Sequence, residues 1–295
     1  MQMQPEFNAI VHRPFSFGLG FLEFTGFGIA VLLAFVISQT IAQHELARRG
    51  HDPSYIPDLI FAAVIGGLVG AKLYYALVIG EIGDLFSRAG FVFWGGLIGG
   101  IIAVLFIAHR KKLNLPRILD VGGICIAAAY SVGRTGCWAV GDDYGKPWLD
   151  SPLAVMFPQG APPSTAAIMS SEFGAASMIP VGTLPGTVLP VHPTQIYEVV
   201  LGFVMFAILW RLRDHRHAEG WLFGVYCVLA GIERFIIEFF RAKDDRFFGP
   251  FTAAQMIALA FIAVGATWMW LRKDVGEGRP GIHAAGAGGP NPVMA

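Results

Sequence analysis

Long runs of apolar residues, separated by short polar stretches, recur along the whole chain. Seven of the runs are long enough to cross a bilayer as helices, which takes about 20 residues each. We place them near 18–42, 58–80, 90–109, 118–140, 194–212, 219–240 and 250–271. The pattern therefore predicts an all-α membrane protein with seven transmembrane helices.

Lysine and arginine residues are unevenly distributed between the connections. Most of them follow the first, third, fifth and seventh runs, as at Arg48, 110–112, Arg213 and Arg272. Cytoplasmic connections are enriched in these two residue types. We therefore expect the N-terminus to lie outside and the C-terminus to lie in the cytoplasm.

The longest connection, 141–193, is extracytoplasmic under this topology, and it is rich in Pro, Gly, Ser and Ala. Such a composition favours turns and short elements rather than a core of its own, and a connection of this length is usually functional or disordered. We expect a single transmembrane catalytic domain over 1–272 with this small head region inserted. The Gly/Ala/Pro-rich segment 273–295 is expected to be a disordered cytoplasmic tail.

Composition agrees with a membrane protein, because 55% of the residues are hydrophobic and only 14% are charged, against about 25% charged residues in soluble domains. The formal net charge of +0 gives no basic field that would suggest a nucleic-acid partner. The 3 cysteines lie in apolar runs without metal-ligand spacing. We therefore expect buried thiols, and neither a metal nor a cofactor.

Arg134 stands inside the fourth apolar run, with Gly133 and Gly136 on either side. An arginine within a membrane span is costly and normally finds an anionic partner, and glycines allow a ligand head group to approach. Two interpretations stay open, namely a lipid head-group site or a structural ion pair. The candidate partners for an ion pair are Glu198, Glu233 and Glu238.

Asp142 and Asp143 follow directly after that run. Adjacent carboxylates repel each other, so the pKa of one of them is expected to be raised, which would suit it to act as a base. In the sixth run, Arg234, Glu238 and Arg241 recur at helical spacing. They form either a self-neutralising pair or, with Arg134, a clamp for a phosphate group, whose oxygens match the guanidinium fork.

Further candidates lie in the other runs. Lys72, in the second run, either extends to the membrane surface or pairs with an acid. Trp94 precedes Gly95 and Gly96, which favour close helix packing or the floor of a head-group groove. His192 and Gln195 begin the fifth run, where a helix N-terminus attracts anions and the histidine can carry a proton.

The arrangement of these motifs resembles the bacterial prolipoprotein diacylglyceryl transferase family, over roughly residues 18–272. The motifs are Gly-Gly-Leu-Ile-Gly at 95–99, Gly-Arg-x-Gly at 133–136, His-Pro-Thr-Gln-Ile-Tyr-Glu at 192–198 and Arg-Phe-x-x-Glu-Phe-x-Arg at 234–241. The resemblance implies a multi-pass enzyme of the bacterial cytoplasmic (inner) membrane, active toward the outer leaflet. It would move a diacylglyceryl group from phosphatidylglycerol to the lipobox cysteine in the signal peptide of a prolipoprotein, with membrane lipids around it.

The resemblance further implies that Arg134 and Arg234 hold the lipid phosphate and that Asp142 takes the place of the family's glutamate. The sequence departs from the family where Trp94 replaces a histidine proposed as the base and Cys137 replaces an asparagine. The alternatives left open are a divergent enzyme with the same reaction, a paralogue with another acceptor, and a non-catalytic lipid-binding protein. A transporter would favour broken helices around a midplane site, whereas these charges gather toward one surface.

Overall fold

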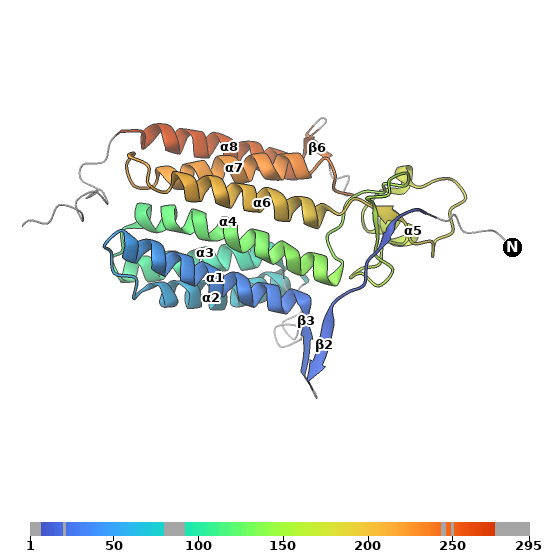
Figure 1. Ribbon diagram of the computed structural model, residues 1–295, viewed down its shortest axis with the longest axis horizontal. Helices are drawn as coiled ribbons and strands as arrows, with labels where there is room; N and C mark the ends of the chain where they lie inside the picture. The colour runs from blue at the N-terminus through green and yellow to red at the C-terminus, as the bar shows by residue number, and fades with distance from the viewer. Residues whose placement is uncertain (1–6, 20–21, 80–91, 243–245, 249–250, 275–295) are drawn as a thin grey trace, which may run out of the picture.

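Seven long helices lie side by side in the computed structural model, and a small region of short elements covers one end of them (Figure 1). The structure describes residues 7–19, 22–79, 92–242, 246–248 and 251–274. The long helices are α1 (Gly26–Arg48), α2 (Ile56–Ile79), α3 (Phe93–Arg110), α4 (Leu115–Val140), α6 (Thr194–Leu212), α7 (Trp221–Ile237) and α8 (Ala253–Leu271). The predicted tail lies outside the described residues from 275 onward.

Each predicted apolar run overlaps one of these helices, so the helical class is confirmed. Within the described residues, 6 helices are long and apolar enough to cross a membrane, which supports a multi-pass membrane protein. The remaining long helix, α7, has 17 residues, slightly fewer than the ~20 that span a bilayer. A seventh crossing therefore stays a prediction, although α7 packs along the membrane helix α8.

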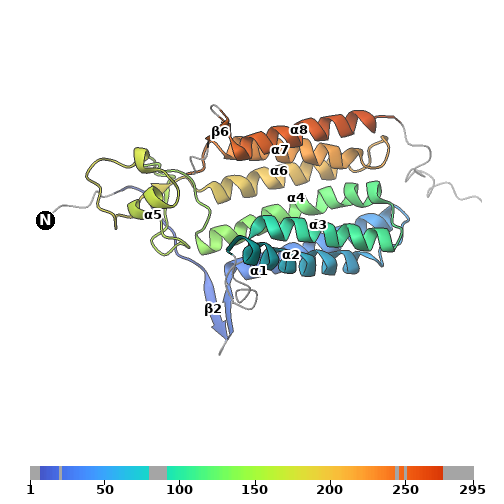
Figure 2. The same ribbon diagram turned by 180° about the vertical axis from the view of Figure 1, so that it is seen from behind.

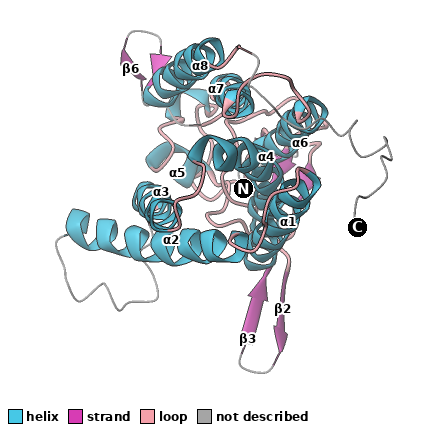
Figure 3. Ribbon diagram, turned by 90° about the vertical axis from the view of Figure 1, so that its left-hand side faces the viewer, coloured by secondary structure: helices cyan, strands magenta, loops and turns pink. Residues whose placement is uncertain are grey.

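Helix α4 lies at the centre of the bundle and packs against α1, α6 and α7, as the view along the helices in Figure 3 shows. Its buried face includes Ile124, Ala127 and Ser131, and small residues there let neighbouring helices approach closely. Gly136 is one of them, because a Cβ at this position would lie 2.8 Å from the Cβ of Ala30 on α1. The bundle thus holds Arg134 on the central helix, near the end covered by the head region.

Helices α2 and α3 form a second close pair (Figure 2). Gly95 and Gly99 on α3 face Gly66 and Gly70 on α2, with backbone against backbone. This arrangement supports the interpretation of the glycine motif as close helix packing.

We expect Gly99→Ala to lower the free energy of unfolding by about 1–3 kcal/mol, the usual cost of overpacking. The added Cβ would overlap the backbone oxygen of Gly66 and lie 2.8 Å from the Cα of Gly70. Thermal unfolding in detergent measures the effect. Gly122→Ala on α4 is the control, because a Cβ there meets nothing within 4 Å. Equal stability of the two variants would contradict the packing argument.

The start of the first predicted helix was wrong. Residues 18–19 and 22–25 do not begin a helix, because β2 (Ser16–Leu19) and β3 (Leu22–Thr25) pair antiparallel before α1. The rings of Phe17 and Phe24 stack across this strand pair, with centroids 5.3 Å apart, and Thr25 caps α1 by accepting from the Gly28 N–H. An apolar run alone does not distinguish a strand from a helix.

The head region corrects a second expectation, because residues 141–193 do build a core. Tyr144, Phe157, Met169 and Leu189 are buried together in one cluster. Around it lie the three-stranded sheet of β1 (Ile10–Val11), β4 (Val155–Met156) and β5 (Pro190–Val191), the helix α5 (Ala166–Ser171) and the turn η2 (Ala176–Met178). A second antiparallel strand pair, β6 (Arg246–Phe248) with β7 (Phe251–Thr252), precedes α8.

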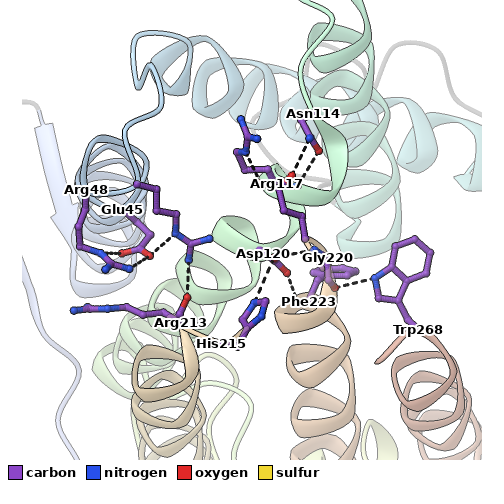
Figure 4. A network of polar contacts seen from close by, with 12 residues as sticks. Glu45, Arg48, Asn114, Arg117, Asp120, Arg213, His215, Gly220, Phe223 and Trp268 are labelled. Atoms are coloured by element: carbon purple, nitrogen blue, oxygen red, sulfur yellow. Dashed lines mark hydrogen bonds and ion pairs between the residues drawn. The ribbon is translucent and has the colours of Figure 1, made fainter. Parts of the chain in front are cut away.

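The opposite end of the bundle is held by polar contacts (Figure 4). Asp120 on α4 accepts from the backbone N–H groups of Gly220 and Phe223 at 2.8 and 3.0 Å, and so caps the start of α7. Arg117, three residues before Asp120, pairs with Glu219 at 2.8 Å. An acid at a helix N-terminus satisfies free donors and interacts favourably with the helix dipole.

Candidate functional site

A cluster of ion pairs lies where α4 ends against the head region. The guanidinium of Arg134 donates to Asp143 Oδ2 at 2.6 Å and to Glu198 Oε1 at 2.7 Å. The same Asp143 carboxylate accepts at Oδ1 from Arg241, at 2.8 Å. One carboxylate thus holds two arginines, from separate parts of the chain, beside each other. Such a pair of forked donors suits a phosphate group.

The turn after α4 positions this carboxylate. Gly141 ends the helix with φ +71, and Asp143 has φ +59, a left-handed conformation that aspartate tolerates better than most residues. Two side chains from the start of α6 hold the turn, because Thr194 Oγ1 donates to the Asp143 carbonyl at 2.8 Å and Gln195 Nε2 to the Asp142 carbonyl at 2.6 Å. Gln195, a predicted binding residue, therefore supports the turn from a fully buried position.

Asp142 and Asp143 differ in protonation although they are adjacent. Burial and the charge of Asp143 raise the pKa of Asp142 to about 6. Burial acts to raise the pKa of Asp143 as well, but the charges of Arg241 and Arg134 outweigh it and bring that pKa below its usual range. The predicted inequality between the two carboxyls is therefore present, with Asp142 as the group that can exchange a proton near neutral pH.

Two further acids lie deeper in the bundle. Glu198 on α6 is fully buried and forms an ion pair with Arg134. It is one of the three candidate partners that the sequence left open for this arginine. Glu233 on α7 is also buried and accepts from the hydroxyl of Tyr130 at 2.8 Å. The role of Tyr130 was missed, because a tyrosine in an apolar helix gives no signal of the acid that faces it.

The two arginines of the sixth predicted run, Arg234 and Arg241, have separate ion-pair partners. Arg234 pairs with Glu238 at 2.7 Å, one turn along the chain, and Glu238 also accepts from the Thr252 hydroxyl. The expectation that Arg241 shares their helical face was wrong, because α7 ends at Ile237. Arg241 instead bridges to the Gly145 backbone in the head region.

Arg234 and Arg134 nevertheless lie near the same acid, because the positive charges of both interact with the carboxyl group of Glu233. The side chain of Arg234 is 35% exposed and that of Arg134 16%. Arg234 is therefore the more accessible of the two cations, and Arg134 the more firmly held. Each guanidinium carries five N–H donors, so the ion pairs with Asp143, Glu198 and Glu238 leave donors for an anionic ligand.

His192 lies half-buried at the edge of the cluster, just before α6. Its ring stacks on Trp148 with centroids 4.3 Å apart, and its Nδ1 lies 3.3 Å from the Tyr197 hydroxyl. Burial and the charge of Lys146 lower its pKa, so the imidazole is neutral at pH 7 and can accept a proton.

The remaining predicted residues lie at the margins of the cluster. Gly133 faces open space, with nothing within 4 Å of a Cβ built on it, which leaves room for a head group beside Arg134. Trp94 is exposed at the start of α3, and Gly96 faces α2 beside Gly95. Lys72 lies half-buried on α2. Their part in substrate binding stays a prediction.

The turn after α4 is poorly suited to bind a metal cation. Among the described residues, one set of potential ligands gathers there, because donor atoms of Cys137, Asp142 and Asp143 lie within 4.8 Å of one another. Both oxygens of Asp143 already accept from arginines. A metal ion would compete with two guanidinium groups for the same carboxylate, so the donors favour an anionic ligand nearby.

Comparison with known proteins places this arrangement in a family. The chain is 29% identical over 279 residues to a protein of Geobacter sulfurreducens named phosphatidylglycerol–prolipoprotein diacylglyceryl transferase, which covers 89% of this chain and 97% of the relative. Proteins of the same name from Clostridium tetani and Proteus mirabilis are each 28% identical, covering 86% and 92% of this chain and 95% and 96% of their own lengths. The profile of the family matches residues 14–271, and the chain therefore belongs to the prolipoprotein diacylglyceryl transferase family.

Proposed function

We propose that the protein transfers the diacylglyceryl group of phosphatidylglycerol to the lipobox cysteine in the signal peptide of a prolipoprotein. The observation that carries this proposal is the pair of arginines, Arg134 and Arg241, held on one carboxylate at the end of the bundle. Family membership supports the same reaction, and the names of the relatives state its lipid and its acceptor. This arginine arrangement is present although Trp94 and Cys137 stand where the family has a histidine and an asparagine.

In the proposed reaction the cysteine thiol gives its proton to a base, and the thiolate attacks the glyceryl carbon that bears the phosphate. A C–S bond forms while the C–O bond breaks, and glycerol phosphate leaves with the electron pair as an anion. Arg134 and Arg234 hold the phosphate, with Arg241 beside Arg134 on the Asp143 carboxylate, and these charges stabilise the charge that grows on the leaving group. Glu238 and Asp143 orient these guanidinium groups through the ion pairs described above.

Asp142 is the proposed base, because the indole of Trp94 cannot take the role of the family's histidine. Its pKa of about 6 lets it be ionised at pH 7 while remaining basic enough to accept a proton. His192 is the second candidate, since its neutral imidazole also accepts protons.

We expect transfer to fall below pH 6 by about tenfold per pH unit, because protonated Asp142 cannot serve as a base. The measurement is the initial rate between pH 4.5 and 8 in membranes of fixed lipid composition. In Asp142→Asn this acid limb should disappear together with most of the activity. If the limb persists in Asp142→Asn and vanishes in His192→Gln, the histidine is the base.

The topology belongs to the same proposal. The head region and the active site face the periplasmic side of the bacterial cytoplasmic membrane, and the arginine-rich end faces the cytoplasm. Seven crossings then place the C-terminus in the cytoplasm. Arg48, Arg117 and Arg213 lie together at the end of the bundle opposite the head region (Figure 4), as this orientation requires.

The direct test incubates the purified protein with vesicles of phosphatidylglycerol and a lipobox peptide. Mass spectrometry of the peptide should show the added diacylglyceryl group on the cysteine, with release of glycerol phosphate. Phosphatidylethanolamine vesicles and a peptide with serine in place of the cysteine are the controls. Lipid binding without any product would favour the non-catalytic alternative.

A further inference from the structure

A cavity of about 240 Å³ lies between the charge cluster and the head region. Asp143 and Arg241 of the charge cluster line it, together with Glu172 and Phe173 from the segment after α5. No sequence motif points to Glu172 or Phe173, because they follow the short helix α5 in a segment expected to lack a core.

We propose that this cavity is the subsite for the acceptor polypeptide and holds the residues next to its reacting cysteine. The inference rests on the proposed function, since it assigns a place to the second substrate of that reaction. Glu172 and Phe173 would be positioning residues that bring the thiol to the lipid held by the arginines.

The chemistry of the lining favours a polypeptide over the acyl chains or the phosphate of the lipid. Acyl chains require apolar surroundings, whereas the lining includes the charged side chains of Asp143, Glu172 and Arg241. Inside the cavity a phosphate anion would meet the carboxylates of Glu172 and Asp143 and only one guanidinium, so the arginine cluster beside the cavity is the better phosphate site. A peptide offers both backbone N–H donors and apolar side chains, and this mixture fits the wall.

The two head residues supply those two kinds of contact. Glu172 is exposed, and no hydrogen bond or ion pair of its carboxylate is found within the described part of the chain, so it can accept from a peptide N–H. The ring of Phe173 packs on Tyr144, with centroids 5.5 Å apart, and presents an apolar wall. Buried Met169 and Ala175 anchor the segment on either side.

The position also suits the direction of attack. A displacement at carbon requires the thiol to approach opposite to the departing phosphate oxygen, with both groups held in line. The cavity shares Asp143 and Arg241 with the cluster that would hold the phosphate. A peptide in the cavity would therefore reach the lipid head group from the head side, while the acyl chains stay among the helices.

The test measures KM for each substrate separately. In Glu172→Ala we expect KM for a lipobox peptide to rise about tenfold, as for the loss of a hydrogen bond to a charged acceptor. KM for phosphatidylglycerol should stay unchanged, and Glu172→Gln should recover most of the affinity because its amide oxygen still accepts. Asp150→Ala removes another exposed carboxylate of the head, outside the cavity, and should leave both values unchanged.

An unchanged peptide KM in Glu172→Ala, or a raised KM for the lipid instead, would overturn the subsite. A second measurement does not depend on turnover. p-Benzoylphenylalanine at position 173 should cross-link to the lipobox peptide, whereas the same group at Val181, an exposed position of the head, should not. Cross-linking without any lipid transfer would retain the subsite and reject the proposed reaction, and equal cross-linking at both positions would reject the subsite.

Discussion

Arg134→Ala will reduce diacylglyceryl transfer by at least about 10³-fold, because loss of one preorganised donor at a developing anion already costs about 10²–10³-fold. Arg134 supplies a whole charge rather than a single donor. It also holds Asp143 and Glu198 in place through ion pairs of 2.6 and 2.7 Å. The variant therefore loses both the charge at the phosphate and the geometry of the cluster.

Stability must be separated from activity in this test. Removing Arg134 leaves the fully buried carboxylate of Glu198 without its cation, and an uncompensated buried charge costs about 3–5 kcal/mol. Glu198→Gln in the same background removes that charge. We expect the double variant Arg134→Ala/Glu198→Gln to unfold at a higher temperature than Arg134→Ala, and to remain inactive.

Arg48→Ala provides a matched control at the other end of the bundle. Arg48 also pairs with a fully buried glutamate, Glu45, at 2.6 Å, and Glu45 keeps Arg49 as a second partner, so Arg48→Ala perturbs a buried ion pair far from the proposed site at a smaller cost in stability. Transfer per folded molecule should equal that of the unmodified protein. Folded Arg134→Ala/Glu198→Gln that still transfers the lipid would contradict the role assigned to Arg134.

The helices could be predicted from the sequence for two reasons. Side chains that face lipid must be apolar, so each span appears as a long apolar run. Without water, the backbone of a span must satisfy its own hydrogen bonds, so such a run forms a helix. The same pattern failed at residues 18–19 and 22–25, where an apolar strand pair precedes α1. It also missed the core of the head region, because Tyr144, Phe157 and Leu189 are separated by turns and come together only through tertiary contacts.

The candidate site was predictable where partners are close in the chain. Arg234 and Glu238 are four residues apart, and their pair follows from helical spacing. The bridge from Arg241 to Asp143 spans 98 residues and depends on where α7 ends. No local pattern encodes that end, so the sequence placed Arg241 on the helix and left its true partner unnamed.

Asp143→Asn should lower kcat by about 10²-fold, because the two arginines lose the carboxylate that aligns them and misplacement at an active site commonly has this effect. The backbone should remain intact, since asparagine also tolerates the positive φ of this position. Its amide has one accepting oxygen, so it cannot accept from Arg134 and Arg241 as the two carboxylate oxygens do.

The pH profile of Asp143→Asn distinguishes this alignment from a merely structural role. Burial and the negative charge of Asp143 together raise the pKa of Asp142 to about 6. Without that charge, and with two arginines released, the pKa of Asp142 must fall, so the acid limb of the residual activity should move to lower pH. Asp150→Asn, at an exposed position of the head, should leave the profile in place. A limb that stays at pH 6 or moves upward in Asp143→Asn would show that Asp142 is not the group whose ionisation the reaction requires.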